Sequence, residues 1–135
     1  MHEAWALAKL SPRFGLKVGR QEVSLDDERI FGAVGWTQQA RSHDMAKLVF
    51  LDSTMTAEFG IAFNQDEPQT NTTAYENTQN YKAMQYLHMH KELNQNTGLS
   101  VLFLNNGKQV FEVNGAGEQV TSYIKYSQTL GGRFT

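Results

Sequence analysis

The apolar and polar residues of this chain alternate with a period of two, which is typical of β-strands with two different faces. The clearest stretch runs from Met55 to Phe63, where Met, Ala, Phe, Ile and Phe alternate with Thr, Glu, Gly and Ala. Residues 81–93 also contain good helix formers, so a helix remains the alternative there. The pattern predicts about eight strands, at residues 2–9, 13–23, 43–51, 55–64, 79–93, 98–105 and 119–128, and from near 132.

Short and long connections alternate between these strands. Short turns are predicted at 10–13, 52–54, 94–97 and 129–131, and long polar or glycine-rich connections at 24–42, 64–77 and 105–118. Outer-membrane barrels have short periplasmic turns and long external loops, and their tilted strands need about 9–11 residues to cross the bilayer. The pattern therefore favours an all-β, antiparallel up-and-down transmembrane β-barrel over a soluble β domain, whose strands usually have about 5–6 residues.

Composition removes several other classes. The 135 residues carry a net charge of −2 and contain no cysteine, which excludes disulfide scaffolds and thiolate zinc sites. No run of Lys and Arg provides the basic surface that a nucleic-acid partner needs. The longest apolar run, Leu48 to Leu51, is too short for a membrane-spanning helix, and no signal peptide is visible. We expect residues 1–135 to form part of one domain, without a second one.

Four sequence blocks occur in an order that resembles a known family. They are Gly19-Arg20-Gln21-Glu22, Asp27 to Gly32, Gly35-Trp36 with the polar residues after it, and Arg41-Ser42-His43-Asp44. With His2 to Trp5 before them, residues 2–50 resemble the alginate export family of bacterial outer-membrane porins. The resemblance implies a barrel with more strands than this chain supplies, so we expect an internal, incomplete segment of about eight strands. The last residues, 131–135, would then begin a strand that continues beyond them.

The resemblance also suggests which residues line the pore. It implies that Arg20, Arg29 and Arg41 project into the lumen and form a positive pathway for a polyuronate, since a guanidinium binds carboxylates in a bidentate manner. Glu22 and Asp44 would be the acidic partners of these arginines. The alternative is that all five are ordinary charges of a wet lumen wall. Strict alternation would direct Arg20 toward lipid, so we predict a β-bulge at Gly19 that turns it inward.

The remaining candidate chemistry is sparse. His88 and His90 have the spacing of metal ligands but no identifiable third ligand, so we expect neither a metal site nor another cofactor. The acidic run Asp26 to Glu28 could bind calcium, although a solvated acidic loop is the simpler interpretation. No nucleophile elbow, phosphate-binding loop or zinc-protease motif occurs, and we expect no enzymatic activity.

These observations together predict a passive channel in the bacterial outer membrane. Its partners would be outer-membrane lipid and an anionic polysaccharide such as alginate or a small anionic solute, with no nucleic acid. A soluble carbohydrate-binding β-sandwich is the competing hypothesis, and it requires one strand face to pack into a common core. A third hypothesis, an enzyme on a small outer-membrane barrel, lacks a recognisable nucleophile and base.

Overall fold

The computed structural model describes residues 3–28, 30–31, 42–64, 81–113, 115 and 119–135. These residues form one sheet of seven antiparallel strands in chain order and contain no helix, so the described part has no helix able to cross a membrane. The strands are β1 (Ala4–Lys9), β2 (Phe14–Gln21), β3 (His43–Leu51), β4 (Met55–Phe63), β5 (Ala83–Asn94), β6 (Thr97–Val113) and β7 (Gln119–Phe134).

The predicted all-β, antiparallel up-and-down arrangement is confirmed, and the stretch from Tyr81 to Leu93 forms a strand, not a helix. The predicted number of strands is wrong, because β7 continues through the expected turn at residues 129–131. Gly131 and Gly132 pair with Leu102 and Val101 of β6, so the interstrand bonds outweigh the turn preference of glycine. Most of the glycine-rich stretch from residue 105 likewise belongs to β6.

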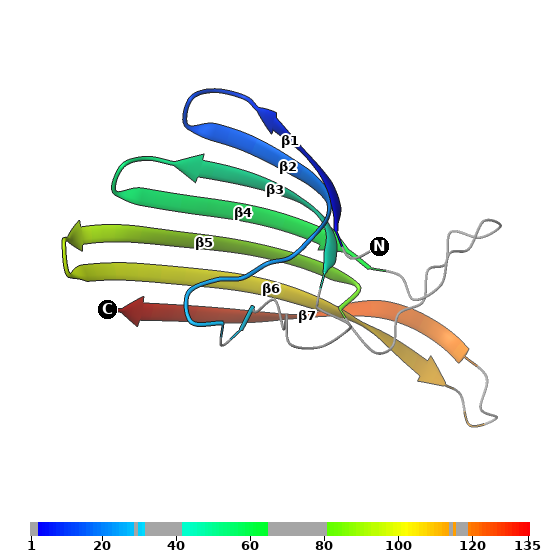
Figure 1. The fold of residues 1–135 in the computed structure, drawn as a ribbon. Coiled ribbons are helices and arrows are strands. Elements are labelled where there is room, and N and C mark those ends of the chain that lie inside the picture. Colours follow the sequence, from blue (N-terminus) through cyan, green and yellow to red (C-terminus); the bar gives the residue numbers. More distant parts are fainter. Residues whose placement is uncertain (1–2, 29, 32–41, 65–80, 114, 116–118) are drawn as a thin grey trace.

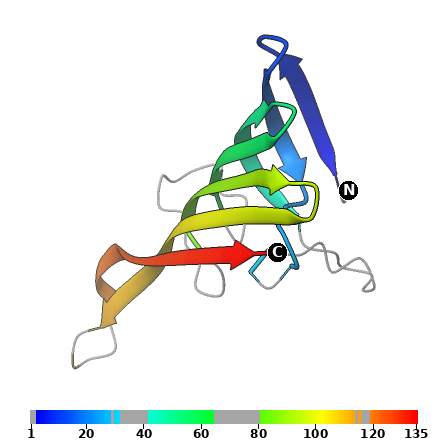
Figure 2. The ribbon, with the colours of Figure 1, turned by 90° about the vertical axis from the view of Figure 1, so that its left-hand side faces the viewer.

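Short connections gather at one end of the sheet, where residues 10–13, 52–54 and 95–96 join consecutive strands. The connections after β2 and β4 leave from the opposite end and are much longer. This alternation agrees with the predicted one up to β6, after which β6 and β7 extend beyond the other strands and are joined through residues 114–118. Figure 1 shows the strands side by side in a strongly twisted sheet, and the turned view in Figure 2 shows its curvature.

One face of the sheet is covered by the chain itself. After β2, residues 22–28 and 30–31 turn back and run across the sheet toward β6 and β7 (Figure 1). We call these residues the crossing segment, and the face they cover the loop face. Apolar side chains of the segment pack on loop-face residues in the buried cluster of Val23, Leu25, Phe31, Met45, Ala62, Met84, Tyr86 and Leu102.

The other face, which we call the open face, is apolar and uncovered by any described residue. Its large side chains are exposed, including Phe59 at 47% and Leu87 at 40%. Charged side chains on the open face of the described strands are restricted to Arg20, Asp44 and Lys91, near strand ends. One registered row crosses all seven strands: Ala8, Leu16, Leu48, Phe59, Leu87, Phe103 and Leu130.

Candidate functional site

The candidate site lies on the loop face, where the crossing segment meets β5, β6 and β7. Backbone bonds shape the segment: Leu25 N–H donates to the Phe31 carbonyl at 3.2 Å, and Glu28 N–H donates to the Leu25 carbonyl at 3.0 Å. Asp26 and Glu28 adopt left-handed backbone conformations, with φ of 51° and 60°. Such a φ is uncommon for residues other than glycine, though aspartate tolerates it better than most. The tight turn directs the Asp26 carboxylate onto the sheet.

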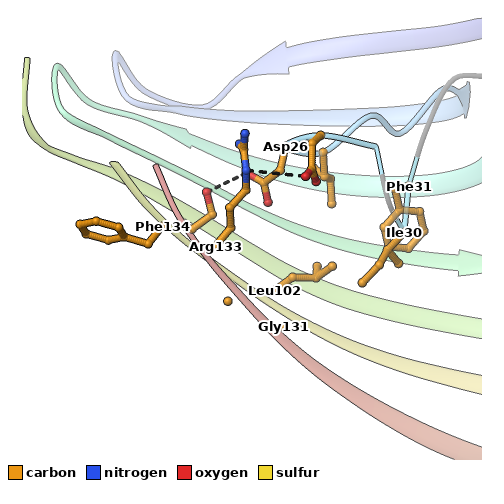
Figure 3. A pocket seen from close by; sticks show the side chains of 11 residues that line it. Asp26, Ile30, Phe31, Leu102, Gly131, Arg133 and Phe134 are labelled. Carbon is orange, nitrogen blue, oxygen red and sulfur yellow. Dashed lines mark hydrogen bonds and ion pairs between the residues drawn. The ribbon is translucent and has the colours of Figure 1, made fainter. Parts of the chain in front are cut away.

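Asp26 connects the crossing segment to three strands. Its Oδ1 accepts a hydrogen bond of 2.7 Å from Ser100 Oγ on β6, and its Oδ2 lies 3.0 Å from His88 Nε2 on β5. Arg133 of β7 is 3.9 Å from Asp26 and equally far from Asp27. Figure 3 shows Asp26 and Arg133 directed toward each other at one end of a pocket that has Ile30 and Phe31 at its other end. The pocket has a volume of about 440 Å³.

The proton positions in this network follow from its geometry. Ser100 Oγ has one proton and donates it to Asp26, so the contact of 2.8 Å between Ser100 Oγ and His90 Nδ1 requires a proton on the histidine nitrogen. His90 therefore cannot accept the serine proton, as the base of a catalytic triad would. Ser100 is also only 3% exposed. The cluster contains the residue types of a serine hydrolase, but its hydrogen bonds hold the crossing segment on the sheet instead of activating the serine.

The Asp26 carboxylate is stabilised in its charged form. Burial of its side chain, which is 17% exposed, acts to raise its pKa. The hydrogen bonds from Ser100 and His88 and the charges of His88 and Arg133 outweigh burial, so the pKa of Asp26 lies below its ordinary value of 3.8. The carboxylate is thus ionised at neutral pH and can accept every contact described above.

A second polar group lies next to this network on β3, β4 and β5. Lys47 Nζ donates to Glu58 Oε2 at 3.1 Å, and the Tyr86 hydroxyl donates to the same oxygen at 3.3 Å. The Tyr86 ring lies across Gly60, where an added Cβ would come within 2.2 Å of the ring. Glycine is therefore required at position 60, because the buried tyrosine occupies the space above it.

A second pocket, with a volume of about 490 Å³, lies toward the end with the long connections. His43 Nδ1 and the Tyr81 hydroxyl are 2.6 Å apart, and their rings are stacked with centroids at 5.7 Å. Burial, together with the negative charge of Asp44, raises the pKa of Tyr81 to about 12. Tyr81 therefore stays a neutral hydrogen-bonding group throughout the physiological pH range.

Two of the five predicted pore residues meet at the rim of this second pocket. Arg20 and Asp44 are direct partners on β2 and β3 and form a bidentate ion pair with distances of 2.8 and 2.7 Å. The predicted bulge at Gly19 is wrong, because pairing with both neighbouring strands continues through it without a change of register. Gly19 instead adopts a φ of 125°. Arg20 consequently remains in the open-face row, at the end of its strand.

The other three predicted residues are not brought together by the described structure. Glu22 follows β2, and its backbone N–H donates to Glu3 Oε1 at 3.1 Å. Arg29 and Arg41 lie outside the described residues, so their expected place in the lumen stays a prediction. The groups of His, Asp and Glu in the described ranges include none that could hold a metal ion.

Sequence reasoning singled out Asp26, His88 and His90, but not Ser100, and did not predict that these residues meet. The acidic run was interpreted mainly as a solvated loop, whereas Asp26 is folded onto the sheet. The alternation of β5 already placed His88 and His90 on one face, and β6 placed Ser100 between apolar neighbours. The missing information was the contact across 62 and 74 residues that Asp26 makes with His88 and Ser100.

Comparison with known proteins identifies no relative. No protein-family model matches the chain, and no curated protein and no solved structure has significant similarity to it.

Proposed function

We propose that this chain forms part of the wall of an outer-membrane β-barrel that resembles the alginate export family and acts as a passive channel for anionic solutes. In this proposal the open face contacts lipid and the loop face lines a water-filled lumen. The crossing segment narrows that lumen. The assignment of faces to lipid and water is supported by the structure's side-chain distribution, and the solute preference by the charges considered below.

The observation that supports the proposal most strongly is which face the chain covers. A soluble single sheet gains stability by covering its apolar face. Here the crossing segment packs on the face that holds Lys47, Glu58, His88 and Ser100, and it leaves the apolar row bare. In an outer-membrane barrel, lipid chains cover such an apolar face, whereas the polar face is in contact with water.

The height of the apolar band can be compared with that of known outer-membrane barrels. On β4 the open face is apolar from Met55 to Phe63, and these nine residues extend for roughly 26 Å along the strand. Tilting by about 45° would reduce the height to roughly 19 Å, which is about three quarters of the apolar band of about 25 Å in outer-membrane barrels. On three further strands Gln85, Asn105 and Gln128 form a hydrogen-bonded ladder, in register with Ile61 and one row before the end of the apolar stretch of β4.

Charges on the loop face support a preference for anions. Its strand residues include the cations Lys9, Lys17, Lys47, Lys108, Lys125 and Arg133, against the carboxylates Glu58, Glu92 and Glu112. Such a wall attracts anions in a channel. The acidic crossing segment offsets part of this charge where it lies, and Asp44 holds Arg20 in an ion pair. We therefore assign the attraction to lysines as well as to Arg29 and Arg41.

Ion selectivity of the complete protein in planar bilayers tests this function. Under a salt gradient the reversal potential should show a preference for anions, and replacing Arg29 and Arg41 by Glu should shift it toward cations. An unchanged reversal potential would refute the role of these arginines, and absence of conductance would refute the channel. Binding of neutral oligosaccharides by a water-soluble form would instead favour the β-sandwich hypothesis.

A further inference from the structure

A shallow groove on the loop face is separate from the crossing segment and from both pockets described above. It lies across β1, β2 and β3 near the short turns and has a volume of about 390 Å³. Its apolar lining is unusual for this face: Trp5, Leu7 and Leu51 are 48%, 51% and 56% exposed. Three ammonium groups accompany these side chains, from Lys9, Lys17 and Lys47.

The groove is hollow because of a glycine. Gly15 is directly opposite Lys9 on one side and Val49 on the other, so the row has no side chain in the middle. An added Cβ at this position would touch Leu7 Cδ1 at 3.3 Å, so the wall of the groove closes closely around it. Gly15 thus leaves a gap between Lys9 and Val49 of the neighbouring strands, and Leu7 covers part of that gap.

Four cations line the groove, and two of them have no anionic partner in the described part of the chain; Arg13 is paired with Asp52 at 3.5 Å. Lys47 is paired with Glu58, whereas no carboxylate of the described residues is within ion-pair distance of Lys9 or Lys17. The Lys17 ammonium is instead 4.0 Å from the centroid of the Trp5 ring. The ring attracts the cation and holds it at the groove without neutralising it.

We propose that this groove binds a small carboxylate with an apolar body, of the aromatic carboxylate class. The carboxylate would lie between the ammonium groups of Lys9 and Lys17, and the apolar body would lie over Gly15 against Leu7 and Val49. A sugar ring fits less well, because its hydroxyls need several hydrogen-bonding partners and the lining has few polar side chains besides the cations. The proposal rests on the proposed function only in taking the loop face to be in contact with water.

The test is a titration of the complete, folded protein with sodium benzoate at constant ionic strength, measured by isothermal titration calorimetry. Three other compounds serve as control probes. Benzyl alcohol lacks the charge, and sodium glucuronate lacks the apolar body. Sodium sulfate lacks both the carboxylate and the apolar body. We expect saturable binding of benzoate, with the three other probes at least about fivefold weaker. Equal binding of any of them, or no binding of benzoate, would overturn the proposal.

Variants locate the site. Lys9→Gln and Lys17→Gln should each weaken benzoate binding by about two- to fivefold, the range for exposed charge pairs. Lys91→Gln on the open face of β5 is the matched control and should leave the affinity unchanged. Equal losses in all three variants would overturn the assignment to this groove. Membrane insertion is measured separately, so benzoate binding without insertion would refute the proposed function while supporting the site.

Discussion

Replacing Asp26 by Asn should release the crossing segment from the sheet while leaving the sheet folded. The substitution preserves the shape of the side chain but removes the charge that Ser100 and His88 contact at 2.7 and 3.0 Å. A hydrogen bond to a charged group contributes about 1.5–3 kcal/mol. An Asn oxygen can still accept from Ser100, whereas its amide nitrogen meets the proton of His88. We therefore expect a net loss of about 2 kcal/mol in docking of the segment.

Hydrogen exchange measures this loss at named amides. The Leu25 and Glu28 N–H groups are bonded within the segment, so their exchange reports its opening. When the exchange rate is set by the equilibrium between the docked and the open segment, a loss of about 2 kcal/mol corresponds to roughly 30-fold faster exchange. Strand amides of β5, such as that of Leu87, should keep their rates. Unchanged exchange at Leu25 and Glu28, or equal acceleration in β5, would refute the role of Asp26 in docking.

The neighbouring Asp27 provides a matched control for the same change. Its carboxylate is 3.9 Å from Arg133, and its side chain is 34% exposed. Asp27→Asn should thus accelerate exchange much less than Asp26→Asn.

The pH dependence of docking follows from the same contacts. Because the folded pKa of Asp26 lies below 3.8, its contribution is complete above the ordinary value and decreases as the pH falls through the folded pKa. The wild-type segment should therefore open in acid, and the acid-induced part of its exchange should be absent in Asp26→Asn. Equal acid sensitivity in both proteins would contradict this linkage.

Three further substitutions test the sheet and its rim. Gly19→Ala should destabilise the protein by more than about 1 kcal/mol in denaturant titration, since a Cβ would lie 2.3 Å from the Ala4 carbonyl oxygen at a φ of 125°. Gly131→Ala, whose Cβ has no neighbour closer than 4.0 Å, should change stability little. Arg20→Ala should cost at most about 1 kcal/mol in the same assay, because both partners of its ion pair are about half exposed; a larger loss would show that the pair holds the strand ends together.

The sequence predicted much of the fold because alternation is a local signal. The residues from Met55 to Phe63 show by themselves which side chains share a face. It failed where local preference and pairing disagree: Gly131 favours a turn, but pairing with Leu102 keeps β7 continuous. Alternation places Arg20 on the open face, whereas the pore hypothesis needs it on the loop face, and this conflict suggested a bulge at Gly19. The structure has no such bulge, because Arg20 stays in the open-face row and pairs there with Asp44.

The candidate site was less predictable than the fold. Its contacts join residues from the crossing segment to strands far along the chain, and Asp26 reaches His88 through a left-handed turn that no motif in the sequence specifies. The contacts of Asp26 with His88 and Ser100 also change its role, from a solvated loop residue to one that holds the crossing segment on the sheet. Neither effect is encoded in the spacing of residues within one strand.

Depth-dependent fluorescence in lipid tests the central claim, that the open face contacts lipid and the loop face contacts water. Single tryptophans are introduced at Phe59, Leu130 and Thr129 of the complete protein, with Trp5 and Trp36 replaced by Phe. In vesicles of lipid with brominated chains, we expect strong quenching of Phe59→Trp and Leu130→Trp. The neighbouring Thr129→Trp on the loop face should be quenched by aqueous acrylamide instead. Equal quenching by brominated lipid at all three positions, or none at any, would contradict the account.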